Sequence, residues 1–150
     1  MAFEALAGTW RGGGKGHYPT IQPFEYLEEL IISPVPERPV AGWVSRTRDA
    51  VTLEPRHGES GYLRVVDAGV ELVLAHTFGV LELCTGSLDD NGTALEVSSI
   101  SVVPSPTAKR IDRIVRNYRL DGNALRYDVS MAAVGIDLTH HLSAELRRQL

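Results

Sequence analysis

The sequence predicts an all-β protein, namely an up-and-down barrel of about ten antiparallel strands. Short segments alternate between apolar and polar side chains, as in Leu125 to Met131, where every second residue is apolar. Residues that favour turns, such as Asp121-Gly122-Asn123, separate these segments. Most strands follow one another at a spacing of roughly ten to twelve residues, which leaves no room for crossover helices, so neighbouring strands are expected to run antiparallel.

Each expected strand is an alternating or apolar run that ends at turn residues or at a proline. The run Phe24 to Ile32 has one face that is apolar except at Glu28. Ser33 to Pro39 and Val103 to Thr107 contain prolines and are expected as loops at the barrel rims, while Leu142 to Leu150 is compatible with a short terminal helix. The expected strands are, in chain order, Thr9–His17, Phe24–Ile32, Val40–Arg48, Gly61–Val66, Val70–His76, Val80–Thr85, Ala94–Val102, Ile111–Leu120, Leu125–Met131 and Leu138–Leu142.

A sheet with one apolar face can bury that face by closing on itself, and closure also removes the unpaired sheet edges. A barrel of about ten strands is too wide for its own side chains to fill, and it normally encloses a ligand cavity. The predicted fold therefore points to the binding of a small molecule inside the barrel.

The composition is that of one soluble globular domain spanning residues 1–150, with 43% hydrophobic and 23% charged residues. The net charge of -4, from 15 basic and 19 acidic residues, argues against nucleic acid or an anionic membrane as the main partner. No apolar run approaches the roughly 20 residues of a membrane span, and the first residues lack the layout of a signal peptide. We therefore expect a cytoplasmic protein that acts on small molecules, as a monomer or a homodimer.

Cys84 is the only cysteine, which excludes an internal disulfide and a cysteine-cluster metal site. Its position in the apolar run VLELCTG favours a buried strand interior over a reactive thiol, which needs nearby positive charge. Any metal must therefore be held by histidine, by carboxylate or in a prosthetic group.

The segment from Gly8 to Gly16, GTWRGGGKG, is rich in glycine. A phosphate-binding loop or a dinucleotide fingerprint would need a helix directly after it, and the following residues HYPTIQPF cannot begin one. A glycine-rich first strand fits better, because glycines let a strand bend and let another backbone or a flat ligand come close. Trp10 is then expected to plug one end of the barrel.

The motif made by Gly8, Trp10, Gly12 and Gly14 fits the Gly-x-Trp-x-Gly-x-Gly pattern of the nitrobindins. The likeness continues in order through GHYPTIQPFEYLEEL, ESGYLRV, VELVLAHTFGVLEL, PTAKRID, LRYDVSMAAVG and LTHHLSAELRR, so the chain resembles that family over nearly its whole length. The resemblance implies a ten-stranded barrel similar to lipocalins and fatty-acid-binding proteins. It also implies one ferric heme b per chain on a single axial histidine, binding of nitric oxide, and isomerisation of peroxynitrite to nitrate.

The resemblance places the axial heme ligand at His141, the histidine of the LxxHL element, whereas His140 falls where the family varies. Thr20 in YPTI and Lys109 in PTAK match positions that contact the heme in relatives. Adjacent residues on an extended strand face opposite sides, so at most one of the two histidines can point into the barrel. A single protein ligand leaves the sixth iron position open for a small molecule. No side chain beyond the heme iron is expected to act as a catalyst.

The remaining histidines have simpler interpretations: His17 and His57, like His140, are expected at the rim or on the surface. His76 ends an apolar strand and could border the cavity, although a hydrogen-bonding role is the simpler expectation. The expected apolar walls of the heme slot are Ile21, Val129 and Met131. Two other functions stay open: a barrel that carries a lipid or another apolar molecule without catalysis, and a nitric oxide sensor that reports to a partner.

Overall fold

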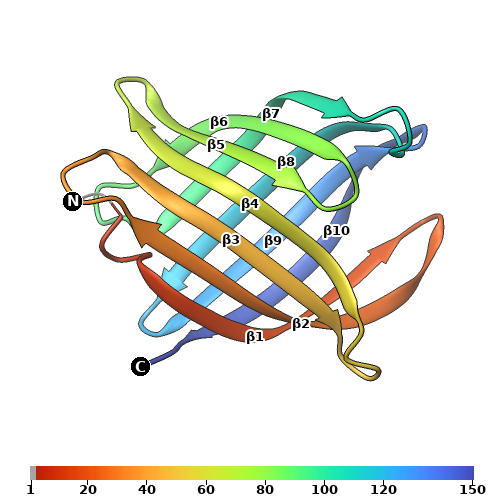
Figure 1. Ribbon diagram of the computed structural model, residues 1–150, viewed down its shortest axis with the longest axis horizontal. Helices are drawn as coiled ribbons and strands as arrows, with labels where there is room; N and C mark the ends of the chain where they lie inside the picture. Colours follow the sequence, from red (N-terminus) through yellow and green to blue (C-terminus); the bar gives the residue numbers. More distant parts are fainter. Residues whose placement is uncertain (1–2) are drawn as a thin grey trace.

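The computed structural model describes residues 3–150, which form a closed barrel of ten antiparallel strands (Figure 1). Each strand pairs with its neighbours in sequence, and β10 pairs with β1 to close the barrel, which confirms the predicted fold. No helix that could cross a membrane occurs in these residues. The strands are β1 (Gly8–Tyr18), β2 (Ile21–Pro34), β3 (Val40–Asp49), β4 (Pro55–Val66), β5 (Gly69–His76), β6 (Val80–Leu88), β7 (Ala94–Pro104), β8 (Ile111–Asp121), β9 (Ala124–Ala133) and β10 (Ile136–Arg148).

The last strand corrects the prediction of a terminal helix over Leu142 to Leu150. β10 continues as a strand to Arg148, and its second half pairs with β1 from Leu142 to Arg148 and with β9 from Leu142 to Arg147. Strand pairing prevails here because closing the barrel requires a partner for β1, and an unpaired edge would expose backbone groups. Leu146 then points into the core and is fully buried, while Arg147 faces solvent.

β4 begins six residues before the predicted start at Gly61, at Pro55. The missed residues pair with β3, across one irregularity, and from Glu59 onward also with β5, but they carry polar side chains on the inner face, including His57 and Glu59. Apolar alternation could not reveal this part of the strand because its inner face lines a cavity instead of the apolar core.

One end of the barrel is closed by the N-terminal turn. The indole Nε1 of Trp10 donates a hydrogen bond to the carbonyl oxygen of Leu6 at 2.9 Å, and Phe3 packs beside them in the core. The guanidinium of Arg148 lies over the Trp10 ring at 4.3 Å from its centroid. All three apolar side chains are essentially inaccessible to solvent, so Trp10 closes the barrel as expected.

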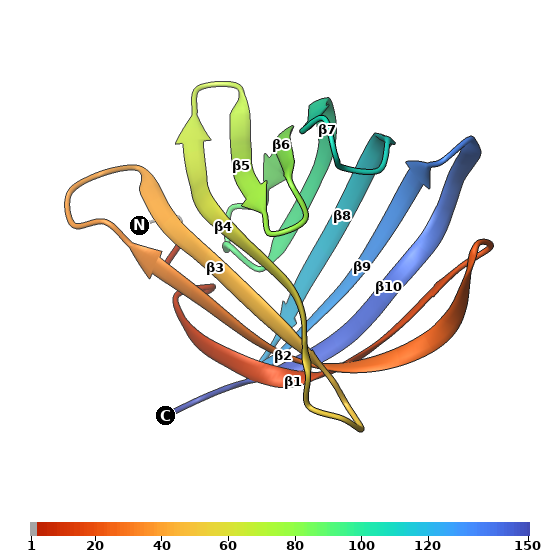
Figure 2. The ribbon, with the colours of Figure 1, turned by 45° about the vertical axis from the view of Figure 1, so that its right-hand side comes forward.

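The opposite end is open and is bordered by the turns that follow the odd-numbered strands. In an up-and-down barrel these connections all lie at the same end. Figures 1 and 2 both show the β1–β2 and β9–β10 turns at this end, on the side away from the chain termini. Segments far apart in sequence therefore meet at this mouth.

Glycines of β1 leave room for close neighbours on both sides of the strand. A Cβ atom at Gly12 would collide with the backbone of β10 at Glu145 and Leu146, so this glycine permits close approach of a second backbone. At Gly14 the space is taken by the ring of Tyr26, which lines the cavity. The glycines thus admit a neighbouring strand and an aromatic ring of β2.

Candidate functional site

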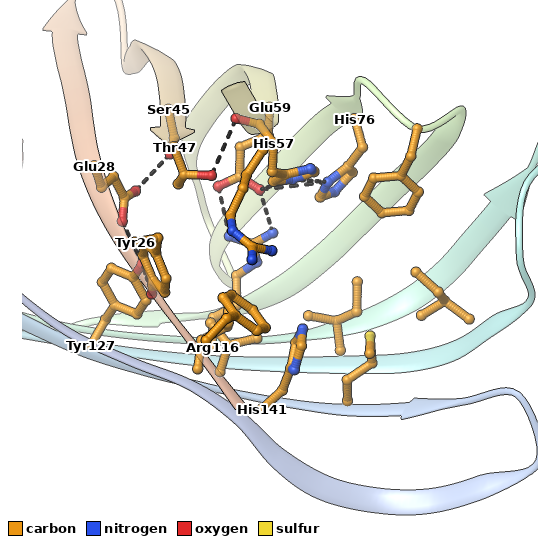
Figure 3. A pocket seen from close by; sticks show the side chains of 18 of the residues that line it. Tyr26, Glu28, Ser45, Thr47, His57, Glu59, His76, Arg116, Tyr127 and His141 are labelled. Atoms are coloured by element: carbon orange, nitrogen blue, oxygen red, sulfur yellow. Dashed lines mark hydrogen bonds and ion pairs between the residues drawn. The ribbon is translucent and has the colours of Figure 1, made fainter. Parts of the chain in front are cut away.

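A cavity of about 300 Å³ opens at the mouth of the barrel. This volume is at the lower end of the range for small-molecule pockets, roughly 300 to 1,000 Å³. The cavity has apolar walls near the mouth and a group of charged and polar side chains on its inner side (Figure 3). The apolar lining comprises Ile21, Phe24, Phe78, Ile111, Ile114, Val129, Met131 and Leu142, which includes the three walls expected from the sequence.

His141 lies in β10 and points into this cavity (Figure 3). Its Nδ1–H donates a hydrogen bond to the backbone carbonyl oxygen of His17, at 2.9 Å. In the neutral ring that leaves Nε2 as the nitrogen with a free lone pair. Burial lowers the pKa of His141. The hydrogen bond to the His17 carbonyl raises this pKa, whereas the neighbouring His17 and His140 side chains lower it further, and the net shift is downward. The neutral form, which can bind a metal, is thereby favoured.

His140 lies outside the cavity, on the surface of β10. Its Nδ1 is 2.7 Å from Nε2 of His17, and its Nε2 is 3.0 Å from a carboxylate oxygen of Asp128. The pairing of β10 with β9 shifts register between His140 and Leu142, which marks an irregularity at His141. Of the two adjacent histidines, only His141 faces the cavity, in agreement with the alternation argument.

A buried charged network occupies the inner side of the cavity and is centred on Arg116 of β8. Arg116 forms ion pairs with Glu59 of β4 at 2.8 Å and with Glu82 of β6 at 2.7 Å. The Nε2 atom of His76 lies 2.8 Å from the same Glu82, and its Nδ1 lies 3.0 Å from Nε2 of His57. Register explains this grouping, because Glu59 and His76 lie directly opposite each other on β4 and β5.

The ion pairs decide the charge state of this network. Burial alone would raise the pKa of Glu82, but the positive charge of Arg116 and the hydrogen bond with His76 outweigh it and lower that pKa to about 2. Arg116 likewise overcomes the burial of Glu59 and, with the His57 hydrogen bond, lowers its pKa well below the usual value. Both carboxylates are therefore ionised at neutral pH.

Glu28, the polar residue on the apolar face of β2, belongs to a second hydrogen-bonded group. Its carboxylate accepts hydrogen bonds from the hydroxyls of Ser45, at 2.6 Å, and Tyr127, and the Tyr127 hydroxyl also lies 2.6 Å from that of Tyr26. Burial raises the pKa of Glu28, which the two hydrogen bonds only partly oppose. Glu28 therefore lines the cavity as a hydrogen-bonded polar group, and its neutral form is favoured by burial.

Thr20 and Lys109 are exposed and do not line the cavity. Thr20 lies in the β1–β2 turn next to the lining residue Ile21, and Lys109 lies in the β7–β8 loop two residues before Ile111. Both therefore lie at the mouth, on segments that border it.

Several cavity residues escaped the sequence-based expectations, among them Arg56, His57, Glu59 and Arg116. His57 was expected at the rim or on the surface; it lines the cavity and contacts His76. Arg56 also lines the cavity, with its guanidinium 4.2 Å from the centroid of the Phe24 ring and 3.1 Å from Asp49. Arg56 and His57 both lie in the polar run PRHGES, which forms part of a strand. A polar run in a strand indicates a cavity wall only once a cavity is known to lie beside it.

Cys84 is buried as expected, and its thiol donates a hydrogen bond to the carboxylate of Glu82 at 2.9 Å.

Comparison with known proteins agrees with this arrangement. Residues 1–148 match the family model described as the THAP4-like, heme-binding beta-barrel domain. The chain is 44% identical to peroxynitrite isomerase 2 of Mycobacterium marinum and 46% identical to peroxynitrite isomerase 2 of Mycobacterium avium, in each case over 99% of this chain and 93% of the relative. It also superposes on the crystal structure of Rv2717c from M. tuberculosis with a TM-score of 0.92 and 42% identity, covering 99% of this chain and 96% of the other. These matches confirm the resemblance noted in the sequence: the chain belongs to the THAP4-like, heme-binding β-barrel family.

Proposed function

We propose that this chain binds one ferric heme b through His141 and isomerises peroxynitrite to nitrate. The family supports heme as the cofactor, and the names of the mycobacterial relatives support the reaction. The observation that carries the proposal is the Nε2 atom of His141, which faces a largely apolar cavity with its lone pair free because Nδ1 donates to His17.

The residues around His141 fit a heme. An iron ligand must be neutral and fixed in orientation, and the hydrogen bond from Nδ1 to a backbone carbonyl provides both the tautomer and the orientation. The edge of the His141 ring also packs against Tyr18, with ring centroids 5.4 Å apart. Ile21, Val129 and Met131 supply the apolar surroundings that a porphyrin needs.

The geometry of β10 leaves His141 as the one member of the adjacent histidine pair that could hold the iron. His140 points outward to Asp128, so it cannot join His141 on the same iron. When bound, a ferric heme would supply Lewis-acid and one-electron chemistry for the conversion of peroxynitrite to nitrate. The chain's own part would be to hold His141 in place, to limit the access of water with the apolar walls of the cavity, and to leave room there for peroxynitrite or nitric oxide.

Charged groups at the mouth suit the anionic parts of a heme and an anionic substrate. Arg56 lines the cavity, and we propose that its guanidinium attracts such anions there. Thr20 and Lys109 are proposed to meet the heme propionates, by hydroxyl and by charge, because they lie on the segments next to Ile21 and Ile111. Three further expectations remain predictions: a single domain over residues 1–150, a cytoplasmic location, and a monomeric or homodimeric state.

The test is stopped-flow decay of peroxynitrite with protein reconstituted with hemin. We expect the reconstituted protein to accelerate decay above free hemin and to raise the yield of nitrate, and the His141→Ala variant to lose this advantage. Decay no faster than with free hemin would contradict the proposed catalysis and favour a nitric oxide sensor.

The rival function, a carrier of a lipid or another apolar molecule, has less support from the comparisons. The matched family is described by heme binding and the relatives by peroxynitrite isomerisation, not by a lipid. Native mass spectrometry of protein purified from cells separates the two functions, since co-purified acyl chains without heme would favour the carrier.

A further inference from the structure

We propose that His57, Glu59 and His76 form a second site, separate from His141, which binds a divalent transition-metal ion such as Zn²⁺ or Fe²⁺. Two imidazoles and one carboxylate are a common ligand set for these ions and leave further coordination positions open. Within residues 3–150 this is the one group of three or more such side chains whose potential ligand atoms all lie within 4.8 Å of one another.

The spacing of the three ligand atoms suits a single ion. Nε2 of His57 lies 3.0 Å from Nδ1 of His76, and the Glu59 oxygen Oε2 lies 3.9 Å from the first nitrogen and 3.7 Å from the second. Ligand atoms bound at about 2.0–2.1 Å in a tetrahedral site are about 3.4 Å apart. The three atoms therefore need to move by only a few tenths of an ångström, on the rigid strands β4 and β5, to bind one ion.

The surrounding hydrogen bonds hold two of the ligands in the form that a metal requires. His76 can donate from Nε2 to the carboxylate of Glu82, which leaves the lone pair on Nδ1 directed at His57 and Glu59. The guanidinium of Arg116 donates hydrogen bonds to both carboxylate oxygens of Glu59 and so fixes the orientation of that carboxylate. A carboxylate behind a ligating histidine is a recurrent feature of metal sites and raises the basicity of the ligand.

The charges of the network also leave a place for a cation. Glu59 and Glu82 carry two negative charges, and both are paired with the single guanidinium of Arg116. The three side chains are buried, so the remaining charge of -1 is poorly screened by water. A divalent ion between the two histidines would more than neutralise this charge, which remains because Arg116 compensates only half of the negative charge of the two carboxylates.

The proposed ion would face the cavity from the wall opposite His141. β5, which carries His76, lies five strands from β10 in either direction around the ten-stranded barrel. In Figure 3 the His57–His76 pair and His141 accordingly lie on different sides of the cavity. Because the two sites share no residue, binding at the second site does not depend on the heme function proposed above.

The experiment is a titration of untagged, heme-free protein with Co²⁺, followed by its visible absorption, and with Zn²⁺, followed by calorimetry. We expect one ion per chain at this site. The His57→Ala and His76→Ala variants should weaken binding by roughly 100-fold or more, because even outer-shell partners of a metal ligand contribute about 10- to 100-fold. Glu82→Gln should weaken binding by roughly 10-fold through His76.

Matched controls separate this site from other histidines. His140→Ala, in the exposed His17–His140 pair, and His141→Ala should both keep wild-type affinity for Zn²⁺ and Co²⁺. His57 is the primary variant because its side chain is 30% exposed and its replacement leaves the ion pairs of Arg116 with Glu59 and Glu82 in place, as a thermal unfolding curve will verify. Failure of the wild type to bind either ion, or binding that survives His57→Ala and His76→Ala, would overturn the proposal.

Discussion

The Nδ1 atom of His141 in β10 lies 2.9 Å from the backbone carbonyl oxygen of His17 in β1. This contact joins the first strand of the barrel to the last, at the mouth of the cavity. Because the carbonyl can only accept a hydrogen, the contact determines that Nδ1 carries it and that Nε2 faces the cavity as a potential ligand. The closure of the barrel thus fixes the tautomer of the proposed heme ligand.

We predict that His141→Ala weakens hemin binding by roughly 100-fold or more and shifts the Soret band, because the proposed axial ligand is lost. His140→Ala is the matched control: its ring is bonded to His17 and Asp128 on the surface, so the spectrum and affinity should stay close to wild type. Titration of the heme-free protein with hemin measures both. A wild-type spectrum for His141→Ala would rule out this ligand.

Replacement of Arg116 by Met should lower the free energy of unfolding by about 3–5 kcal/mol, because Glu59 and Glu82 would be left buried without their partner. Arg119→Met on the same strand removes an exposed ion pair with Glu96 and should cost at most about 1 kcal/mol. Urea denaturation of the three proteins measures the difference. Equal losses in the two variants would show that the buried network contributes no more than a surface pair.

The lowered pKa of Glu82 predicts a loss of stability in acid. The carboxyl titrates at about 2 in the folded chain and at its ordinary value of 4.5 when unfolded. Its contribution is therefore fully present above pH 4.5 and is lost as the pH falls towards 2, since the unfolded chain then binds more protons. At about 1.4 kcal/mol for each pKa unit, the contribution is on the order of a few kcal/mol.

Denaturation curves between pH 5 and pH 2 test this prediction. Glu82→Gln should show a shallower loss of stability over this range than the wild type, although it is less stable at neutral pH. Glu96→Gln removes an exposed carboxylate and should keep the slope of the wild type. A slope that Glu82→Gln leaves unchanged would mean that other groups govern the acid transition.

Gly14→Ala should destabilise the barrel by roughly 1–3 kcal/mol, because its Cβ atom would overlap the ring of Tyr26 and force that ring to move within the cavity. Gly13→Ala is the control, since its Cβ atom would meet only the Tyr26 carbonyl oxygen, at the ordinary contact distance of 3.5 Å. Thermal unfolding measures stability, and hemin titration reports whether the displaced ring alters the cavity. Equal melting temperatures for the two variants would contradict this account of Gly14.

Alternation of apolar residues predicts most of the strands, because a strand between the barrel core and solvent must have one apolar face. It succeeds at Leu125 to Met131 of β9 and fails at two places for different reasons. In β4 the inner face turns polar at His57 and Glu59, where the strand borders the cavity. In β10 the residues after Leu142 suit either a helix or a strand, and only pairing with β1 decides between them.

The sequence by itself determined the barrel, the presence of a cavity inside it and the resemblance that singles out His141, because these follow from local alternation, turn chemistry and an ordered series of motifs. The tertiary structure alone decided which polar groups meet inside. Arg116 contacts Glu59 and Glu82, residues 57 and 34 positions away, because the closed sheet brings β4, β6 and β8 around one interior. The same closure groups His57 with His76, since register across neighbouring strands, and not distance along the chain, sets which side chains share the cavity.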